Sequence, residues 1–324
     1  MSTLPEYSVA IRTLGKAGRL FEDLIRSLKN QTHPPKSIFV YLAEGYQQPE
    51  AVADESYITC PKGMVRQRAL QYEEIDTEYI LFCDDDVYLP PHAIQEFFDA
   101  LIENHGDCIA PNVFQHHKAS LKNKIMAGIY SETLPSFFAK YAIRIRKSSH
   151  FSYVVRPQRV MPTQSFAGIC FLVKKASFLA VHFEEECWMD QFSYALGDDQ
   201  LLAYKMYLVG YSLLAYFDSG IEHRDAKTGH VQDDRERLHS KYFLRYVIWY
   251  RSIYQTRISR MGKCHAVFSY YCAWLWHFIV AFLLRIARKK KQELGAAVTG
   301  LRDARRFVKS EKYLKLPKWQ KIGG

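Results

Sequence analysis

Hydrophobic and polar residues follow two different periods along the first hundred residues, which predicts a regular succession of strands and helices. Short β-branched and aromatic runs predict strands at 8–13, 37–42, 56–59, 79–83 and 108–113. Apolar residues that recur every three or four positions predict amphipathic helices at 15–29, 63–74 and 91–103. Because strands and helices alternate with short connections, we expect an α/β fold with a mostly parallel, doubly wound sheet and flanking helices.

Residues 114–160 interrupt this pattern, because they are rich in Lys, Arg, His, Ser and aromatic side chains. They are either an inserted flap that binds an acceptor or a solvated excursion of loops and helix. Beyond them the pattern predicts strands at 168–173 and 212–216 and helices at 198–209 and 235–260. We therefore expect one domain over 1–235, with the insert inside it, and a helical C-terminal region over 236–324.

Residues 264–284 contain no Asp, Glu, Lys or Arg, and the segment is about as long as a helix that spans a bilayer. Basic residues flank both of its ends, whereas the positive-inside rule favours one basic flank. Trp274 and Trp276 lie in its middle and not at two interfaces. We favour a helix or helical hairpin in the cytoplasmic headgroup layer; a spanning helix and a buried protein helix are the alternatives.

The net charge of +10 is confined to the C-terminal tail. From Arg285 onward there are thirteen Lys or Arg and three Asp or Glu, whereas the rest of the chain holds 31 of each. Such a tail favours an anionic partner. The neighbouring aromatic residues form an apolar block and are not interleaved with Lys and Arg, as binding of single-stranded nucleic acid requires. We therefore expect an anionic membrane surface as a partner, and no nucleic acid.

Cysteine usage and the N-terminus bear on the cellular compartment. The seven cysteines form no CxxC pair and lie in apolar runs, which indicates reduced thiols in the core of a cytosolic protein. Residues 1–7 have neither the basic nor the apolar region of a secretory signal. We expect a cytoplasmic protein that is peripheral on the inner face of the cell membrane.

Three consecutive carboxylates, Asp84, Asp85 and Asp86, follow the predicted strand 79–83. Adjacent negative charges repel one another and take up protons unless a cation lies among them. Carboxylate oxygens suit Mg²⁺ or Mn²⁺, and such an ion is commonly shared with phosphate oxygens. Because ligands bind at the carboxyl ends of strands in open α/β sheets, this motif predicts a divalent-metal site for a phosphorylated ligand. The alternative is a solvated acidic turn.

A second acidic motif, Gly197-Asp198-Asp199, opens a predicted helix. A carboxylate held ionised at a helix N-terminus can act as a general base toward a hydroxyl group. The alternative is that an acid only caps the helix. His223 follows the strand that ends at Tyr216, and its imidazole is a candidate ligand for Mn²⁺, although a lone histidine is more often a core or surface residue.

The order and spacing of these motifs resemble family 2 glycosyltransferases of the GT-A fold, in particular bacterial enzymes of surface-polysaccharide synthesis. The resemblance covers about residues 7–225 and includes the stretches 9–13, 24–31 and 63–69. It implies an inverting, metal-dependent transfer of a sugar from a nucleoside-diphosphate donor. The acceptor would be a hydroxyl of a saccharide or of a lipid-linked acceptor, such as a polyprenyl-diphosphate-linked saccharide.

The resemblance also implies roles for individual residues. Asp199 would be the general base. The ligands of Mn²⁺ or Mg²⁺ would be Asp86 and His223, together with Asp84, which would otherwise contact the donor's ribose. The other donor-binding residues would be Arg12, Thr13, Glu44, Arg68 and Asp85. The residues on the acceptor side would be Gly168, Trp188 and Asp198.

Two other functional classes compete with this interpretation. A nucleotidyltransferase shares a similar sheet and metal site but is expected to have a glycine-rich phosphate loop after its first strand, of which residues 14–18 are only a faint version. A non-catalytic protein that binds a membrane or nucleic acid would not need the intact acidic pair at Asp198 and Asp199.

Overall fold

The computed structural model describes residues 4–114, 116–131, 133–137, 140–226, 234–286 and 293–320. The strands are β1 (Tyr7–Thr13), β2 (Ser37–Ala43), β3 (Ser56–Cys60), β4 (Tyr79–Asp84), β5 (Val87–Tyr88), β6 (Cys108–Pro111), β7 (Leu134–Ser136), β8 (Ile143–Ile145), β9 (Phe151–Val154), β10 (Val160–Pro162), β11 (Cys170–Lys174), β12 (Leu213–Tyr216) and β13 (Glu222–His223). The α-helices are α1 (Arg19–Lys29), α2 (Ala93–Glu103), α3 (Leu121–Ser131), α4 (Lys175–Leu179), α5 (Asp198–Val209), α6 (Asp234–Trp249), α7 (Arg260–Ile286), α8 (Glu293–Phe307) and α9 (Glu311–Leu314). Two 3₁₀ segments, η1 (His116–Lys118) and η2 (Phe183–Gln191), and one π-helix, η3 (Tyr250–Tyr254), complete the elements.

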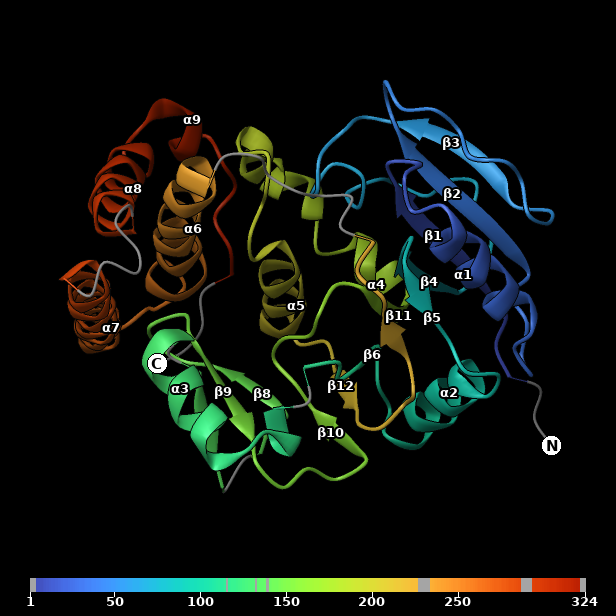
Figure 1. The fold of residues 1–324 in the computed structure, drawn as a ribbon, viewed down its shortest axis with the longest axis horizontal. Coiled ribbons are helices and arrows are strands. Elements are labelled where there is room, and N and C mark those ends of the chain that lie inside the picture. Colours follow the sequence, from blue (N-terminus) through green and yellow to red (C-terminus); the bar gives the residue numbers. More distant parts are fainter. Residues whose placement is uncertain are drawn as a thin grey trace.

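An eight-stranded mixed sheet runs through the protein in the order β10-β12-β6-β11-β4-β1-β2-β3 (Figure 1). The strand pairs β1–β2, β1–β4, β2–β3 and β6–β12 are parallel. Strand β11 is antiparallel to both of its neighbours, and β10 is antiparallel to β12. The predicted, mostly parallel α/β sheet is therefore confirmed, with one reversed strand at its centre.

Both faces of the sheet are buried, and alternate residues of each strand point to opposite faces. On β4, Leu81 and Cys83 pack with α1 and α2, whereas Ile80 and Phe82 pack with α4, α5 and α6. This is why the strand sequences are apolar throughout and do not alternate with polar residues.

The helix predicted over 63–74 is wrong. The structure has hydrogen-bonded turns there, and Gly63 and Tyr72 adopt positive φ angles that a helix does not allow. The backbone N–H groups of Val65 and Arg66 instead donate to the carboxylate of Asp190, at 3.0 and 2.9 Å. A distant side chain thus satisfies the backbone groups at the start of this segment.

Residues 114–160 form more regular structure than a loop excursion. Helix α3 is followed by a separate three-stranded sheet in the order β7-β9-β8, which lies beside α3 (Figure 1). The acceptor-binding role of this insert stays a prediction, as does the division of the chain at residues 235 and 236.

The C-terminal helices gather at one end of the molecule, and strands β1 to β3 lie at the other end, with α5 between them (Figure 1). The helix predicted over 235–260 is shorter than expected, because α6 passes into the π-helix η3 and ends at Tyr254. Ser252 and Thr256 donate to the carbonyl groups of Ile248 and Ser252, which loosens the last helical turns.

The apolar segment 264–284 belongs to the single helix α7. By length and composition alone, Arg260–Leu284 could cross a membrane. One side of α7 is packed against its neighbours through Ala266, Tyr270 and Ala281. The opposite side leaves Phe268, Leu275 and Leu283 exposed. The helix is therefore packed against the protein on one side and carries exposed apolar residues on the other.

The expectation that the cysteines are core thiols is correct for only part of the set. The four buried cysteines are Cys60, Cys83, Cys108 and Cys170. Cys264 and Cys272 are exposed, since both lie on the unpacked side of α7. All seven are free thiols.

A buried carboxylate, Glu186 in η2, holds the C-terminal helices to the sheet. Its oxygens accept hydrogen bonds from Arg251 at 2.8 Å and from the indoles of Trp188 and Trp319 at 2.8 and 2.9 Å. Lys205 of α5 also lies 3.4 Å away. Burial alone would raise the pKa of Glu186, but Arg251 and Lys205 hold it below its usual value.

We predict that Glu186→Gln lowers the free energy of unfolding by about 3 kcal/mol, because it leaves the buried guanidinium of Arg251 without its counter-charge. Urea denaturation measures the change. Glu184→Gln in the same segment removes an exposed carboxylate and serves as the control. Equal unfolding free energies for the two variants would contradict a stabilising role for the buried cluster.

Candidate active site

The site is built around two arginines that hold acidic residues from distant parts of the chain. Arg12 on β1 stands opposite Asp84 in the parallel β1–β4 pair. Its guanidinium donates from Nε to Oδ1 and from Nη2 to Oδ2 of Asp84, the latter at 3.2 Å. Although burial alone would lower the pKa of Arg12, Asp84 raises it, so the ion pair is fixed in its charged form.

Arg68 extends this network to the second acidic motif. Its side chain is only 2% exposed. Nη1 lies 2.9 Å from Oδ2 of Asp198, and Nη2 donates to the carbonyl of Gly168 at 2.7 Å. Arg12 Nη1 is also 3.6 Å from the same Asp198 oxygen, and Arg68 Nη2 is 3.8 Å from Asp84. The two guanidinium groups thus join the β4 carboxylates to the N-terminus of α5.

Asp199 lies beside this network, and no arginine among the described residues forms an ion pair with it. Its Oδ2 accepts the backbone N–H of Gly168 at 3.2 Å, and its Oδ1 accepts that of Gln200 at 2.7 Å. Burial, and then the neighbouring Asp198, raise the pKa of Asp199 to about 6. The carboxylate therefore titrates closer to neutral pH than an ordinary aspartate does.

Gly168 is needed for this arrangement, because a side chain there would displace both neighbours. A Cβ atom at residue 168 would lie 2.8 Å from Arg68 Nη1 and 2.9 Å from the Cβ of Asp199. The strand predicted over 168–173 begins at Cys170, which leaves Gly168 in the loop where its N–H and C=O both serve the site.

The three consecutive carboxylates have different surroundings. Asp85 is buried and accepts a hydrogen bond from Thr13 Oγ1, and burial raises its pKa to about 6. Asp86 lies at the short β5–β13 pair, in which His223 stands opposite Val87. His223 Nε2 is 3.2 Å from Asp86 Oδ1, and Asp86 Oδ2 accepts the N–H of Ala226 at 2.8 Å.

The geometry bears on the expected cation. Asp86 Oδ1 is buried, and among the described residues its polar neighbour is His223 Nε2, at 3.2 Å. A carboxylate oxygen and an imidazole nitrogen side by side fit a divalent ion such as Mn²⁺. Asp84 is different, because both of its oxygens are already bound by Arg12. Across the described residues no group of three or more His, Cys, Asp or Glu side chains is arranged to hold a metal. Asp84 as a metal ligand therefore stays a prediction.

Most residues singled out in the sequence come together here, and two do not. The residues that the structure joins are Arg12, Thr13, Arg68, Asp84, Asp85, Asp86, Gly168, Asp198, Asp199 and His223. Trp188, expected on the acceptor side, is instead buried against Phe307 and donates to Glu186. Glu44 is exposed at the end of β2.

The second acidic motif also differs from the expected helix cap. Gly197, in a left-handed conformation, occupies the N-cap of α5, and no side chain caps the helix there. Asp198 turns inward to Arg68 and is nearly fully buried, so it does not face an open acceptor side.

The residues that position the loop before Arg68, namely Gln67 and Asp190, are not identified by the sequence analysis. Gln67 Nε2 donates to the carbonyl groups of Thr13 and Tyr41, at 3.1 and 3.4 Å. Together with the Asp190 contacts described above, these bonds hold the segment that carries Arg68 against the ends of β1 and β2. No local pattern marks either residue, because their partners are distant in sequence.

Comparisons with known proteins show what this chain is similar to. Residues 8–166 match the family model described as glycosyl transferase family 2. No curated protein matches the sequence. The crystal structure of S. aureus TarS is similar, with a TM-score of 0.52 and 14% identity, over 96% of this chain and 50% of that chain. The crystal structure of GalNAc-T7 with UDP, GalNAc and Mn²⁺ has a TM-score of 0.47 and 10% identity, over 78% of this chain and 51% of that one. The chain thus spans about half the length of either structure.

We predict that Asp199→Asn makes the protein more stable at pH 8, by about 1–2 kcal/mol after allowance for partial exposure of the carboxylate. The raised pKa means that the protonated carboxyl favours folding below about pH 4, and that this stability is lost as the pH rises through about 6. An uncharged amide does not incur that loss. The gain should shrink toward zero near pH 4.

Urea denaturation of both proteins between pH 4 and pH 8 measures this difference. Asp99→Asn, at an exposed position of α2, is the control and should show no pH-dependent gain. A gain that stays constant from pH 4 to pH 8 would show that ionisation of Asp199 does not destabilise the fold, and would contradict a raised pKa.

Proposed function

We propose that the protein is an inverting, metal-dependent glycosyltransferase, because residues 8–166 match the family model of glycosyl transferase family 2. It would move a sugar from a nucleoside-diphosphate donor to a hydroxyl of a saccharide or lipid-linked acceptor in surface-polysaccharide synthesis.

A continuous series of contacts supports this proposal. It runs from the His223–Asp86 pair through the carboxylate turn to Asp84, then through Arg12 and Arg68 to Asp198 and Gly168, and ends at Asp199. A transferase needs a diphosphate-binding group and a base within one sugar's reach of each other. This series of contacts brings candidates for both groups into a single region.

Asp199 is the better candidate for the base of the acidic pair. Asp198 is held by Arg68 and Arg12, so its lone pairs are engaged by cations. Asp199 accepts only backbone N–H groups, and its pKa of about 6 makes it a stronger proton acceptor than a solvated aspartate. It remains mostly ionised at neutral pH and above. It would accept the proton of the acceptor hydroxyl on the face opposite the leaving diphosphate.

Asp86 and His223 would hold a divalent cation, Mn²⁺ or Mg²⁺, through Oδ1 and Nε2. When bound, such an ion neutralises the charge that develops on a diphosphate leaving group. Arg12 and Arg68 would keep Asp84 oriented toward the donor, and Thr13 would orient Asp85. Glu44, at the exposed end of β2, would contact the nucleotide.

The acceptor would approach from the insert over 114–160. An acceptor attached to a lipid would bring the enzyme to the inner face of the membrane, where the exposed side of α7 and the basic tail would bind. The nucleotidyltransferase alternative is less favoured, because the family match is to glycosyl transfer.

We predict that Asp199→Asn lowers the turnover number at least a hundredfold, whereas the dissociation constant for the sugar nucleotide changes less than threefold. The amide cannot accept the hydroxyl proton but keeps the shape of the site. Product release with a panel of sugar nucleotides measures turnover, and calorimetry measures binding. Asp99→Asn is the control. Full turnover in the Asp199 variant would remove the base assignment.

We also predict that Asp86→Ala raises the Mn²⁺ concentration needed for half-maximal donor binding at least tenfold, because it removes the buried Oδ1 ligand. Titration of Mn²⁺ at a fixed nucleotide concentration measures this. Glu222→Gln removes an exposed acid next to His223 and should leave the titration unchanged. Identical titrations for the Asp86 variant and the unmodified protein would argue against a metal role.

A further inference from the structure

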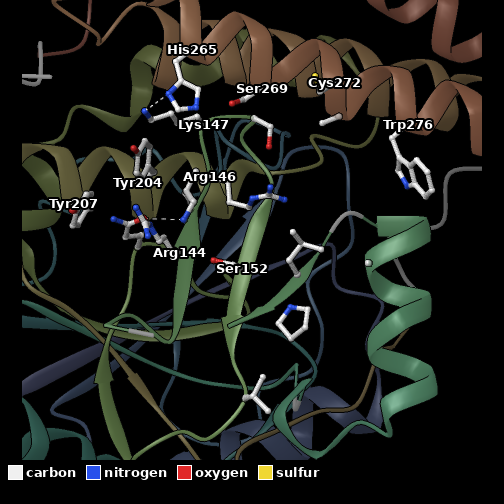
Figure 2. Close-up of a pocket in the computed structure, with 18 of the residues that line it drawn as sticks. Arg144, Arg146, Lys147, Ser152, Tyr204, Tyr207, His265, Ser269, Cys272 and Trp276 are labelled. Atoms are coloured by element: carbon white, nitrogen blue, oxygen red, sulfur yellow. Dashed lines mark hydrogen bonds between the residues drawn. The ribbon is translucent and has the colours of Figure 1, made fainter. Parts of the chain in front are cut away.

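A large concave site lies away from the carboxylates. A cavity of about 1450 Å³ opens between α3, strands β8 and β9, α5 and α7, and we call it the α3–α7 cavity. Helix α7 covers one side of it, and α3 stands at its edge (Figure 2). Trp276 Nε1 donates to the carbonyl of Ile129 at 3.0 Å, which fastens α7 to α3 across the opening.

The interior of the α3–α7 cavity is cationic. Five Lys or Arg side chains line it: Lys124, Arg144, Arg146, Lys147 and Arg257. Neither Asp nor Glu occurs among the described residues that line it. Figure 2 shows Arg144 beside Tyr204 and Lys147 facing His265, whose Nδ1 is 2.8 Å from Lys147 Nζ. Since like charges are gathered here with no carboxylate among the lining residues, the cavity favours an anion.

The rim of the same cavity is apolar and exposed. Leu121 and Ile125 of α3 are 73% and 53% exposed, and Phe268 of α7 is 69% exposed. The unpacked side of α7 continues this surface through Leu275 and Ile279. Exposed apolar surface that adjoins a cationic cavity matches a ligand with a hydrocarbon chain and an anionic head.

We propose that the α3–α7 cavity binds the phosphate or diphosphate headgroup of a long-chain lipid, whose chain lies along the exposed side of α7. Guanidinium groups bind phosphate oxygens through paired N–H donors, which Arg144 and Arg146 supply from alternate positions at the end of β8. Tyr204 and Tyr207 also line the cavity. A free phosphate ion would fill only a small part of this volume and would not cover the apolar rim.

The cavity adjoins the base through α5. Tyr204 lies five residues after Asp199 on this helix, a rise of about 7.5 Å. Gln200 Nε2 donates to Ser149 Oγ at 3.0 Å, in the loop that follows Lys147. A saccharide attached to the bound headgroup would therefore extend toward Asp199. This acceptor role rests on the proposed function, whereas binding of the lipid headgroup does not.

Binding of the full-length protein to phosphatidylcholine vesicles that contain a polyprenyl diphosphate tests the proposal. A second vesicle carries phosphatidylserine at equal total charge. Arg144→Gln/Arg146→Gln removes two charges from the cavity, and Lys309→Gln/Lys312→Gln removes two from exposed positions of the basic tail. Both variants should retain the melting temperature of the parent protein.

We expect the cavity variant to bind the polyprenyl-diphosphate vesicles about tenfold more weakly, and the tail variant to change by less than threefold. On phosphatidylserine vesicles the two variants should weaken equally. Phe268→Asn, at an exposed rim position, should also weaken binding to the first vesicle. Equal weakening of the cavity and tail variants on both vesicles would overturn the proposal, since it would indicate only general electrostatic attraction.

The same variants separate this inference from the proposed function. Asp199→Asn should lose transfer but bind the lipid vesicles normally. Arg144→Gln/Arg146→Gln should bind the sugar nucleotide normally. If no sugar nucleotide binds or reacts, the proposed function fails, while the vesicle comparison still decides whether the cavity binds a lipid phosphate.

Discussion

The insertion of two guanidinium groups between two acidic segments is the constraint on which the site depends. Asp84 ends β4 and Asp198 begins α5, and without cations between them these carboxylates would repel each other. Arg12 and Arg68 bridge them and also bind the carbonyl groups of Met64 and Gly168. The end of the sheet, the loop before β11 and the helix α5 are thereby fixed relative to one another by charge.

This constraint divides the acidic residues into two sets. Asp84 and Asp198 form the first set, because arginine side chains pair with their carboxylates. Asp199 follows Asp198 directly and Asp86 lies two residues after Asp84, and neither carboxylate pairs with a guanidinium group within the described part of the chain. The Asp86 carboxylate has a buried oxygen beside His223, and Asp199 has a raised pKa. The carboxylates that remain free to bind a cation or accept a proton are therefore those that do not pair with Arg12 or Arg68.

Local pattern was enough for the strands of the central sheet other than β10, for most of the helices and for the acidic motifs, but it did not predict the short strands β5, β7, β8, β9 and β13. It failed where distant partners decide the conformation. The apolar spacing over 63–74 suggested a helix, but Asp190 and Gln67 hold that segment in turns. Trp188 follows a run of three glutamates, which is typical of an exposed segment, yet its indole is buried and donates a hydrogen bond to Glu186. The packed side of α7 likewise depends on contacts with η3 and α8, which no single segment encodes.

Helix α5 connects the separate parts of the molecule, because each of its sides has a different neighbour. Its first turn carries Asp199, and Tyr204 and Tyr207 on a later turn line the α3–α7 cavity. Lys205, between those tyrosines, points the other way, to Glu185 and the buried Glu186 cluster that holds Arg251 and Trp319. Because these residues lie on one helix, the buried cluster around Glu186, the α3–α7 cavity and the acidic motif at Asp199 are held in a fixed order along α5.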